Sequence, residues 1–258
     1  MSARAKRDRA DVLLVERSLA PSRARAQAMI LAGEVYAGES RIDKPGQLVD
    51  VALELRVSPR RRFVSRGGEK LDGALRSFGA RFDGLAGVVA VDVGASTGGF
   101  SDCLLQRGAS KVYAVDVGWG QLDDRLRRDP RVVVRERTNA RSLGPEDFAE
   151  PVDLVVVDAS FIGLDKLLPA ISAFLRPGGE LVALVKPQFE AGREAVSKGR
   201  GVIRDREVRE AAIASARGAI EAAGFELVAE VDSEVVGPKG NVERFVHAKR
   251  RLDPGAVG

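Results

Sequence analysis

The chain has 258 residues, of which 45% are apolar, so it can form one large domain or two small ones around a packed core. No apolar run approaches the ~20 residues that span a bilayer, and the basic N-terminus leads into charged sequence rather than a secretory core, so we expect a cytoplasmic protein. Cys103 and His247 are the single cysteine and histidine, which excludes an intrachain disulfide and a thiolate zinc cluster, and we expect no metal site.

Positive charge is concentrated in the N-terminal quarter of the chain. Residues 1–70 contain 15 Lys and Arg against 9 Asp and Glu, although the net charge of the whole chain is only +4. Such a bias favours phosphate contacts with nucleic acid. On charge alone, a solvated basic surface is an equally good interpretation.

The N-terminal segment predicts a small helical and extended unit. Residues 10–19 have the apolar spacing of a short amphipathic helix, which ends near Pro21. Ser22 can cap a second helix over residues 23–32, which Gly33 ends. Residues 34–58 show turns and alternating apolar residues that are typical of short strands.

The motifs in this unit resemble those of the S4 RNA-binding module. They are Ser22-Arg23-Ala24-Arg25 with Ala28, then Ile30-x-x-Gly33-x-Val35, and Lys44-Pro45-Gly46. The resemblance implies an S4-like domain over residues 1–59 that binds structured RNA through shape and phosphates. A helical hairpin used only for dimerisation or packing is the alternative. The basic residues expected to contact RNA are Arg4, Lys6, Arg7, Arg23, Arg25, Lys44, Arg61 and Arg66.

A basic linker over residues 60–66 leads to a second domain over residues 67–258. Its first helix contains Leu71, Leu75 and Phe78 on one face. Strands then alternate with helices, which predicts a doubly wound, mostly parallel α/β sheet of Rossmann-like type. The expected strands are 88–91, 111–115, 132–135, 152–157, 180–185, 226–231 and 242–248, with helices at 164–175 and 205–223.

The sequence VDVGASTGGF, residues 91–100, predicts a strand that runs through a glycine loop into a helix, where an adenosine cofactor docks. Asp116, at the end of the next strand, is placed to accept hydrogen bonds from ribose hydroxyls. The loop lacks the GxGxxG spacing of dinucleotide sites, and a carboxylate at Asp92 suits an ammonium better than a pyrophosphate. We therefore expect S-adenosylmethionine rather than a nicotinamide dinucleotide; a glycine turn that only packs a helix is the alternative.

Three polar residues follow predicted strands in the second domain: Asn139, Asp158 and Lys186. Ligands of open α/β sheets gather at the carboxyl ends of strands. Lys186 follows five apolar residues and precedes Pro187, and burying a lysine is costly, so this position indicates function. A lysine that snorkels to solvent, or an aspartate that caps a turn, is the structural alternative.

Together these motifs resemble the haemolysin-like ribosomal RNA 2′-O-methyltransferases, the TlyA family, over nearly the whole chain. The resemblance rests on SRGGEKL (65–71), DVGASTGGF (92–100), DVGWGQL (116–122), RTNAR (137–141), VVVDASFI (155–162), LVKPQFE (184–190) and GNVERF (240–245). It implies a Lys-Asp-Lys-Glu catalytic tetrad at Lys70, Asp158, Lys186 and Glu243. It also implies S-adenosylmethionine contacts from Asp92, Gly94, Ser96, Thr97, Gly98, Gly99, Phe100, Asp116, Val117, Asn139 and Asp158.

The resemblance further implies methylation of a ribose 2′-hydroxyl in ribosomal RNA, of a cytidine and within ribosomal subunits, by a monomer. Lys186 either removes the hydroxyl proton or stays charged and orients the oxygen, and the sequence leaves this open. The family pattern has a tryptophan where this chain has Phe63, which puts signalling through the linker in doubt.

Three other functions remain open at this point. A pseudouridine synthase is suggested by Arg251-Leu252-Asp253, but only five residues follow. A membrane-lysing protein is suggested by the family's haemolysin name, but no segment has a long apolar face. An inactive RNA-binding protein is the third, although all four tetrad positions are filled.

Overall fold

The computed structural model divides into two compact units, residues 1–62 and 63–258. Arg4 and Arg61, expected to contact RNA, lie outside the described residues. The structure describes residues 6–31, 33–38, 40–57, 62–160, 162–190, 203, 205–237 and 240–252.

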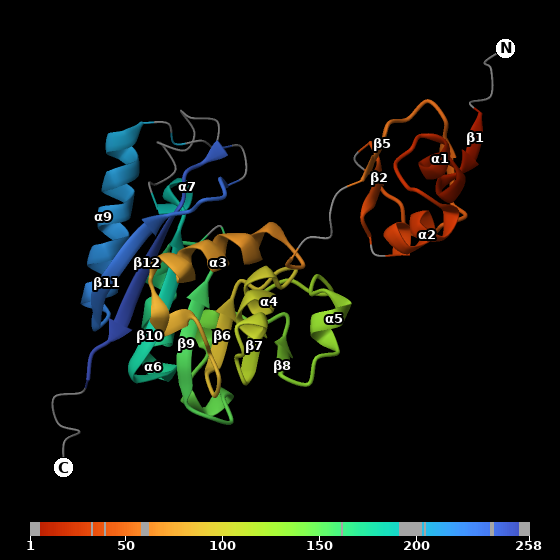
Figure 1. Ribbon diagram of the computed structural model, residues 1–258. Helices are drawn as coiled ribbons and strands as arrows, with labels where there is room; N and C mark the ends of the chain where they lie inside the picture. The colour runs from red at the N-terminus through yellow and green to blue at the C-terminus, as the bar shows by residue number, and fades with distance from the viewer. Residues whose placement is uncertain are drawn as a thin grey trace. The chain divides into compact units, whose positions relative to one another are not determined.

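The first unit packs two helices against short antiparallel strands (Figure 1). Apolar residues of both helices, including Leu14 and Ile30, are buried with Val35 of a strand. The two predicted helices are confirmed, and each is slightly shorter than expected. The elements are β1 (Arg7–Arg9), α1 (Ala10–Glu16), α2 (Arg23–Leu31), β2 (Val35–Ala37), β3 (Ser40–Arg41), β4 (Leu48–Asp50) and β5 (Leu55–Val57).

A buried carboxylate joins the two helices of this unit. Asp11 is fully buried and accepts hydrogen bonds from Arg9, Arg23 and Gln27. The hydrogen bond from Arg9 holds the pKa of Asp11 well below its usual range. The guanidinium of Arg23 therefore already donates one hydrogen bond within the unit, through Nε.

The second unit is an α/β fold around a seven-stranded sheet. Its helices are α3 (Arg66–Ser77), α4 (Gly99–Gln106), α5 (Asp124–Arg127), α6 (Leu168–Phe174), α7 (Pro187–Glu190) and α9 (Arg206–Ala222), with 3-10 turns η1 (Ala80–Phe82), η2 (Ala140–Ser142), η3 (Pro145–Asp147) and η4 (Leu164–Lys166). Its strands are β6 (Val89–Val93), β7 (Lys111–Val115), β8 (Val132–Arg135), β9 (Val152–Val157), β10 (Leu175–Val185), β11 (Phe225–Asp232) and β12 (Arg244–Arg250).

The strand order is β11-β12-β10-β9-β6-β7-β8, and β12 runs antiparallel to the other six strands of this sheet. This confirms the mostly parallel, doubly wound class. β7, the next strand in the chain, pairs with one edge of β6, and the later strand β9 pairs with the opposite edge of β6. In open α/β sheets such a switch point opens a crevice at the carboxyl ends of the strands.

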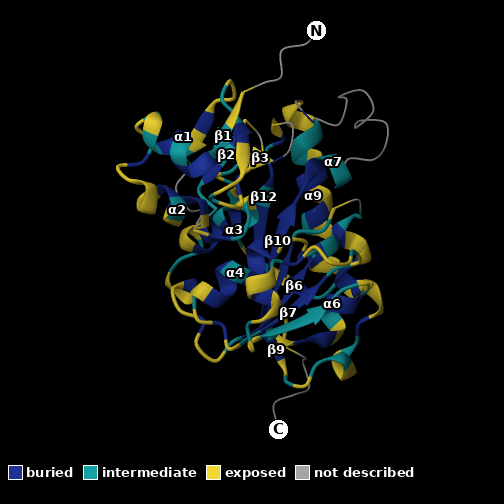
Figure 2. Cartoon of the chain, turned by 90° about the vertical axis from the view of Figure 1, so that its right-hand side faces the viewer, coloured by how far each residue is buried: buried dark blue, intermediate teal, exposed yellow. Residues whose placement is uncertain are grey.

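Helices cover both faces of the sheet, and successive side chains of each strand alternate between them. Helices α3 and α4 pack on one face with Val156, Val182 and Leu184, whereas α6 and α9 pack on the other with Val155 and Val185. Figure 2 shows the central strands buried and the outer sides of helices exposed. The same alternation determines toward which face of the sheet a polar residue at the end of a strand points.

The boundaries of some elements differ from those expected from the sequence. β10 begins at Leu175, five residues earlier than expected, with a register irregularity before Glu180. Phe63 is 3% exposed in the core of the second unit, and Arg66 begins α3, so both lie in this unit rather than in a linker. Among the described residues, no helix is long and apolar enough to cross a membrane.

Candidate active site

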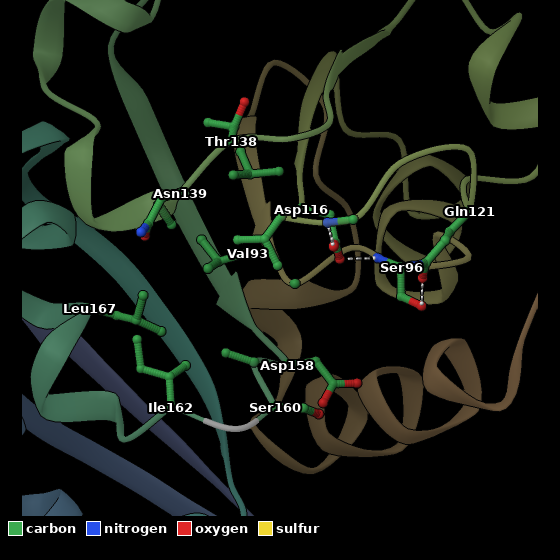
Figure 3. Close-up of a pocket in the computed structure, with 16 residues that line it drawn as sticks. Val93, Ser96, Asp116, Gln121, Thr138, Asn139, Asp158, Ser160, Ile162 and Leu167 are labelled. Atoms are coloured by element: carbon green, nitrogen blue, oxygen red, sulfur yellow. Dashed lines mark hydrogen bonds between the residues drawn. The ribbon is translucent and has the colours of Figure 1, made fainter.

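A cavity of about 380 Å³ lies at the switch point of the sheet. Residues at or after the carboxyl ends of β6, β7, β8 and β9 form most of its wall (Figure 3). Its volume is in the range of small-molecule sites, and apolar walls with a few polar groups are typical of them. The lining residues are Val93, Gly94, Ser96, Val115, Asp116, Val117, Gly118, Gln121, Thr138, Asn139, Ala140, Asp158, Ala159, Ser160, Ile162 and Leu167.

The loop after β6 approaches its neighbours too closely for ordinary side chains. Gly94 has φ +84°, and a Cβ there would lie 2.8 Å from the carbonyl oxygen of Asp158. Ser96 also has a positive φ, 48°, and its amide donates a 2.8 Å hydrogen bond to Asp116 Oδ2. The amide of Gly118 donates to Asp116 Oδ1 at 2.6 Å. Backbone amides therefore fix the Asp116 carboxylate at the cavity wall, as required of a ribose acceptor.

Asn139 begins the turn η2 at another edge of the cavity. Its side-chain Oδ1 accepts from the amide of Arg141 at 3.1 Å, which caps the turn. With the carbonyl oxygen used in this way, the amide NH₂ of Asn139 is the group left to donate to a ligand. An adenine ring, which offers nitrogen acceptors, suits this donor.

The four tetrad residues form two ion pairs. Lys186 Nζ lies 2.6 Å from Asp158 Oδ1, and Lys70 Nζ lies 2.5 Å from Glu243 Oε2. Lys70, Lys186 and Glu243 are 7%, 8% and 0% exposed. Each of these buried charged groups thus lies against a group of opposite charge, whose attraction offsets the free-energy cost of desolvation.

The sheet explains why these residues meet. Asp158 and Lys186 directly follow β9 and β10, and Glu243 directly precedes the antiparallel β12. By alternation, all three share the sheet face that α3 covers, and α3 carries Lys70. Val185 pairs with Arg244, so Lys186 and Glu243 continue that register as neighbours. The two ion pairs therefore lie side by side on the sheet edge that borders the cavity.

Asp92 is placed differently from the other acidic residues. It is fully buried within β6, on the face under α4, and its Oδ2 accepts from the amide and the hydroxyl of Ser101 at 2.8 and 2.7 Å. Burial raises its pKa to about 7; the hydrogen bonds from Ser101 oppose the shift, and the charges of Asp158 and Asp116 add to it. Asp92 does not line the cavity, so its contact with a cofactor stays a prediction.

The structure separates the remaining cofactor residues into two groups. Gly94, Ser96, Asp116, Val117, Asn139 and Asp158 line the cavity, whereas Thr97, Gly98, Gly99 and Phe100 do not. Gly98 and Gly99 instead allow close packing against Leu126 and Ser65, and Phe100 packs near Phe245 with ring centroids 5.9 Å apart. Sequence reasoning missed the lining residues Gln121, Thr138, Ser160, Ile162 and Leu167 as site residues. For Ser160 a signal existed, since it lies two residues after the strand-end Asp158.

Basic residues of the first unit remain available for RNA. Lys6, Arg7, Arg25 and Lys44 are exposed there. Arg23 is partly engaged by Asp11 and its side chain is 55% exposed, while Arg66 is exposed at the start of α3. No group of three or more His, Cys, Asp or Glu suited to a metal ion occurs in the described part of the chain. His247 forms a buried pair with Glu180 between Phe78 and Phe82, far along β12 from Glu243.

The residues present fit S-adenosylmethionine. The cavity combines apolar walls with the carboxylates of Asp116 and Asp158, and a cationic ligand suits that charge. Asp116 offers a carboxylate and Asn139 an amide NH₂ at the cavity wall, groups that suit a ribose and an adenine, and these contacts stay predictions. Asp158 lies at the cavity wall with Lys186 as its ion-pair partner, and a catalytic role for this pair stays a prediction.

Comparison with known proteins finds relatives of both units. The FtsJ-like methyltransferase family matches residues 63–250, and the S4 domain family matches residues 8–55. The 16S/23S rRNA (cytidine-2′-O)-methyltransferase TlyA of Mycobacterium tuberculosis is 44% identical over 251 residues, 96% of this chain and 92% of that protein. The 23S rRNA (cytidine-2′-O)-methyltransferase TlyA of Campylobacter jejuni is 35% identical over 189 residues, 72% and 70% of the two chains. A solved structure described as "Putative hemolysin from Streptococcus thermophilus" has a TM-score of 0.72 and 39% identity, covering 97% of this chain and 91% of that chain.

Proposed function

Because the chain belongs to the FtsJ-like methyltransferase family and carries an S4 domain, we propose that it methylates a ribose 2′-hydroxyl of a cytidine in ribosomal RNA. The observation that carries the proposal is the pair of buried ion pairs, Lys70–Glu243 and Asp158–Lys186, at the edge of a nucleoside-sized cavity. The names of the relatives from Mycobacterium tuberculosis and Campylobacter jejuni support the substrate.

S-adenosylmethionine, when bound, supplies a methyl group on a positively charged sulfur. Asp116 would hold the ribose of this cofactor, and Asn139 the adenine. Gly94 and Ser96 form the loop beside it. Asp158 brings a carboxylate into the same cavity, where negative charge favours a sulfonium.

Lys186 is placed to act on the acceptor hydroxyl. Its ammonium is held by Asp158 at the cavity edge, so it can donate a hydrogen bond to the 2′ oxygen and stabilise negative charge on it. The oxygen–methyl bond would form as the methyl–sulfur bond breaks, and the hydroxyl proton would pass to solvent. Lys70 and Glu243 place a second ion pair beside it. Orientation of the hydroxyl and electrostatic stabilisation then supply most of the rate.

The first unit supplies affinity for the RNA. Exposed Lys6, Arg7, Arg25 and Lys44 suit phosphate contacts, which give salt-dependent binding with little sequence preference. Within this proposal the enzyme acts as a monomer in the cytoplasm, on ribosomal subunits. The ammonium groups of Lys70 and Lys186 provide positive charge at the site, and the proposed reaction uses no metal ion.

The test uses S-adenosylmethionine with a labelled methyl group and separated ribosomal subunits, both intact and stripped of protein. Digestion of the RNA to nucleosides should place the label on the ribose of a cytidine. The comparison of intact and stripped subunits shows whether assembled substrate is required. Label on a base would contradict the proposal.

A further inference from the structure

Ser160 makes a contact with the proposed reaction centre that no tetrad residue supplies. Its Oγ accepts a 2.9 Å hydrogen bond from Lys186 Nζ. An ammonium has three N–H donors. Asp158 forms an ion pair with Nζ through its carboxylate Oδ1 at 2.6 Å, without a hydrogen bond, and its carbonyl oxygen accepts a hydrogen bond from Nζ at 3.5 Å, the outer limit for one. Ser160 therefore accepts the shorter of the two hydrogen bonds that this buried cation donates.

The position of Ser160 connects the buried lysine with the cavity. Lys186 is only 8% exposed, whereas Ser160 is exposed and lines the cavity wall. Figure 3 shows Ser160 next to Asp158, away from Thr138 and Asn139. The ring of Phe189 lies 5.8 Å from Lys186 Nζ and offers no hydrogen-bond acceptor of comparable strength. An ammonium held by Asp158 alone would have greater freedom to rotate away from the cavity.

We propose that Ser160 is a positioning residue, whose hydroxyl holds the Lys186 ammonium at the cavity edge in the orientation that the acceptor 2′-hydroxyl requires. This inference rests on the proposed function. Ser160 thus acts through Lys186 rather than on the reacting atoms.

The test compares Ser160→Ala with Ser160→Thr, which keeps the hydroxyl. A hydrogen bond to a charged group contributes enough that Ser160→Ala should lower kcat by roughly 10- to 100-fold. The KM and the calorimetric dissociation constant for S-adenosylmethionine should stay within about twofold, because Asp116 and Asn139 are intact. Ser160→Thr should restore kcat to within a few-fold. Ser110→Ala is the matched control, since its hydroxyl donates only to the carbonyl of Val88 at the other end of the sheet.

Lys186→Ala, assayed in parallel, separates this inference from the proposed function. If Lys186→Ala is inactive and Ser160→Ala has the wild-type kcat, the role of Ser160 is wrong and the function stands. If Ser160→Ala weakens S-adenosylmethionine binding while kcat is unchanged, Ser160 is a cofactor contact and the inference is overturned. If Lys186→Ala transfers methyl groups at the wild-type rate, the proposed function itself fails. Circular dichroism of each variant checks that the fold is retained.

Discussion

Replacing Asp92 with Asn should change how the stability of the ligand-free protein depends on pH. Asp92 is fully buried, and only its Oδ2 is bonded, to Ser101. Burial raises its pKa to about 7, against 3.8 for an unperturbed aspartate. The folded state thus binds this proton more tightly than the unfolded state. The contribution of protonated Asp92 to stability is fully present below pH 3.8 and is lost as the pH rises through about 7.

The size of the effect follows from the two pKa values. A difference between 3.8 and about 7 corresponds to on the order of 4 kcal/mol, at about 1.36 kcal/mol per unit. Asparagine keeps an oxygen for Ser101 and carries no charge, so any cost of its unpaired NH₂ is independent of pH. As the pH rises from 5 to 7, the free energy of unfolding of wild type should therefore fall by roughly 2–3 kcal/mol relative to that of Asp92→Asn.

Urea unfolding of both proteins at a series of pH values between 5 and 8 measures this difference. Circular dichroism follows the whole chain, and fluorescence of Trp119, the single tryptophan, reports on the second unit. Asp129→Asn is the control, because the hydrogen bond from Arg131 lowers the pKa of Asp129 and gives the opposite sign. A constant free-energy difference between wild type and Asp92→Asn from pH 5 to 7 would refute the reasoning.

Three further predictions concern packing, the buried carboxylate of the first unit and RNA affinity. Gly98→Ala should lower the free energy of unfolding by at least about 2 kcal/mol, measured by chemical unfolding, because a Cβ at Gly98 would lie 2.2 Å from a Leu126 carbon and Gly98 has φ +94°. Gly79→Ala is the control for backbone strain alone. Gly79 has φ +90° and open space around its Cβ position, so this variant should lower the free energy of unfolding by less. Asp11→Asn should speed hydrogen exchange in residues 6–57 and leave exchange in the second unit unchanged, since it removes a charge that three donors hold. Lys44→Ala should reduce the slope of log affinity for RNA against log salt by about one, whereas Lys166→Ala, paired with Asp165 on the second unit, should leave the slope unchanged.

Much of the fold could be predicted because its strands are short, continuous apolar runs. The ranges 111–115, 132–135 and 152–157 coincide with β7, β8 and β9, since each contains a run of valine and other apolar residues, which is typical of strands. β7 and β9 are largely buried, whereas β8 is half-buried. The start of β10 could not be predicted, because Pro177, Gly178 and Gly179 indicate a break and tertiary pairing with β9 overrides it.

The site could be predicted only in part, since its contacts depend on which sheet face each residue occupies. Lys70 and Glu243 are 173 residues apart, and only the family resemblance placed them in one tetrad. Asp92 was expected beside a ligand from its spacing to the glycines, yet alternation along β6 turns it under α4. Ser160 carries no motif of its own, and its contact with Lys186 becomes visible only when β9 and β10 lie side by side.

Lys186→Ala tests the central claim most directly, when methyl transfer to ribosomal RNA and S-adenosylmethionine binding are measured on the same preparation. Lys186 contacts Asp158 and Ser160 and does not line the cavity, so its removal should abolish transfer and leave the calorimetric dissociation constant of the cofactor within a few-fold of wild type. Transfer at a near-wild-type rate would contradict the assignment of this site.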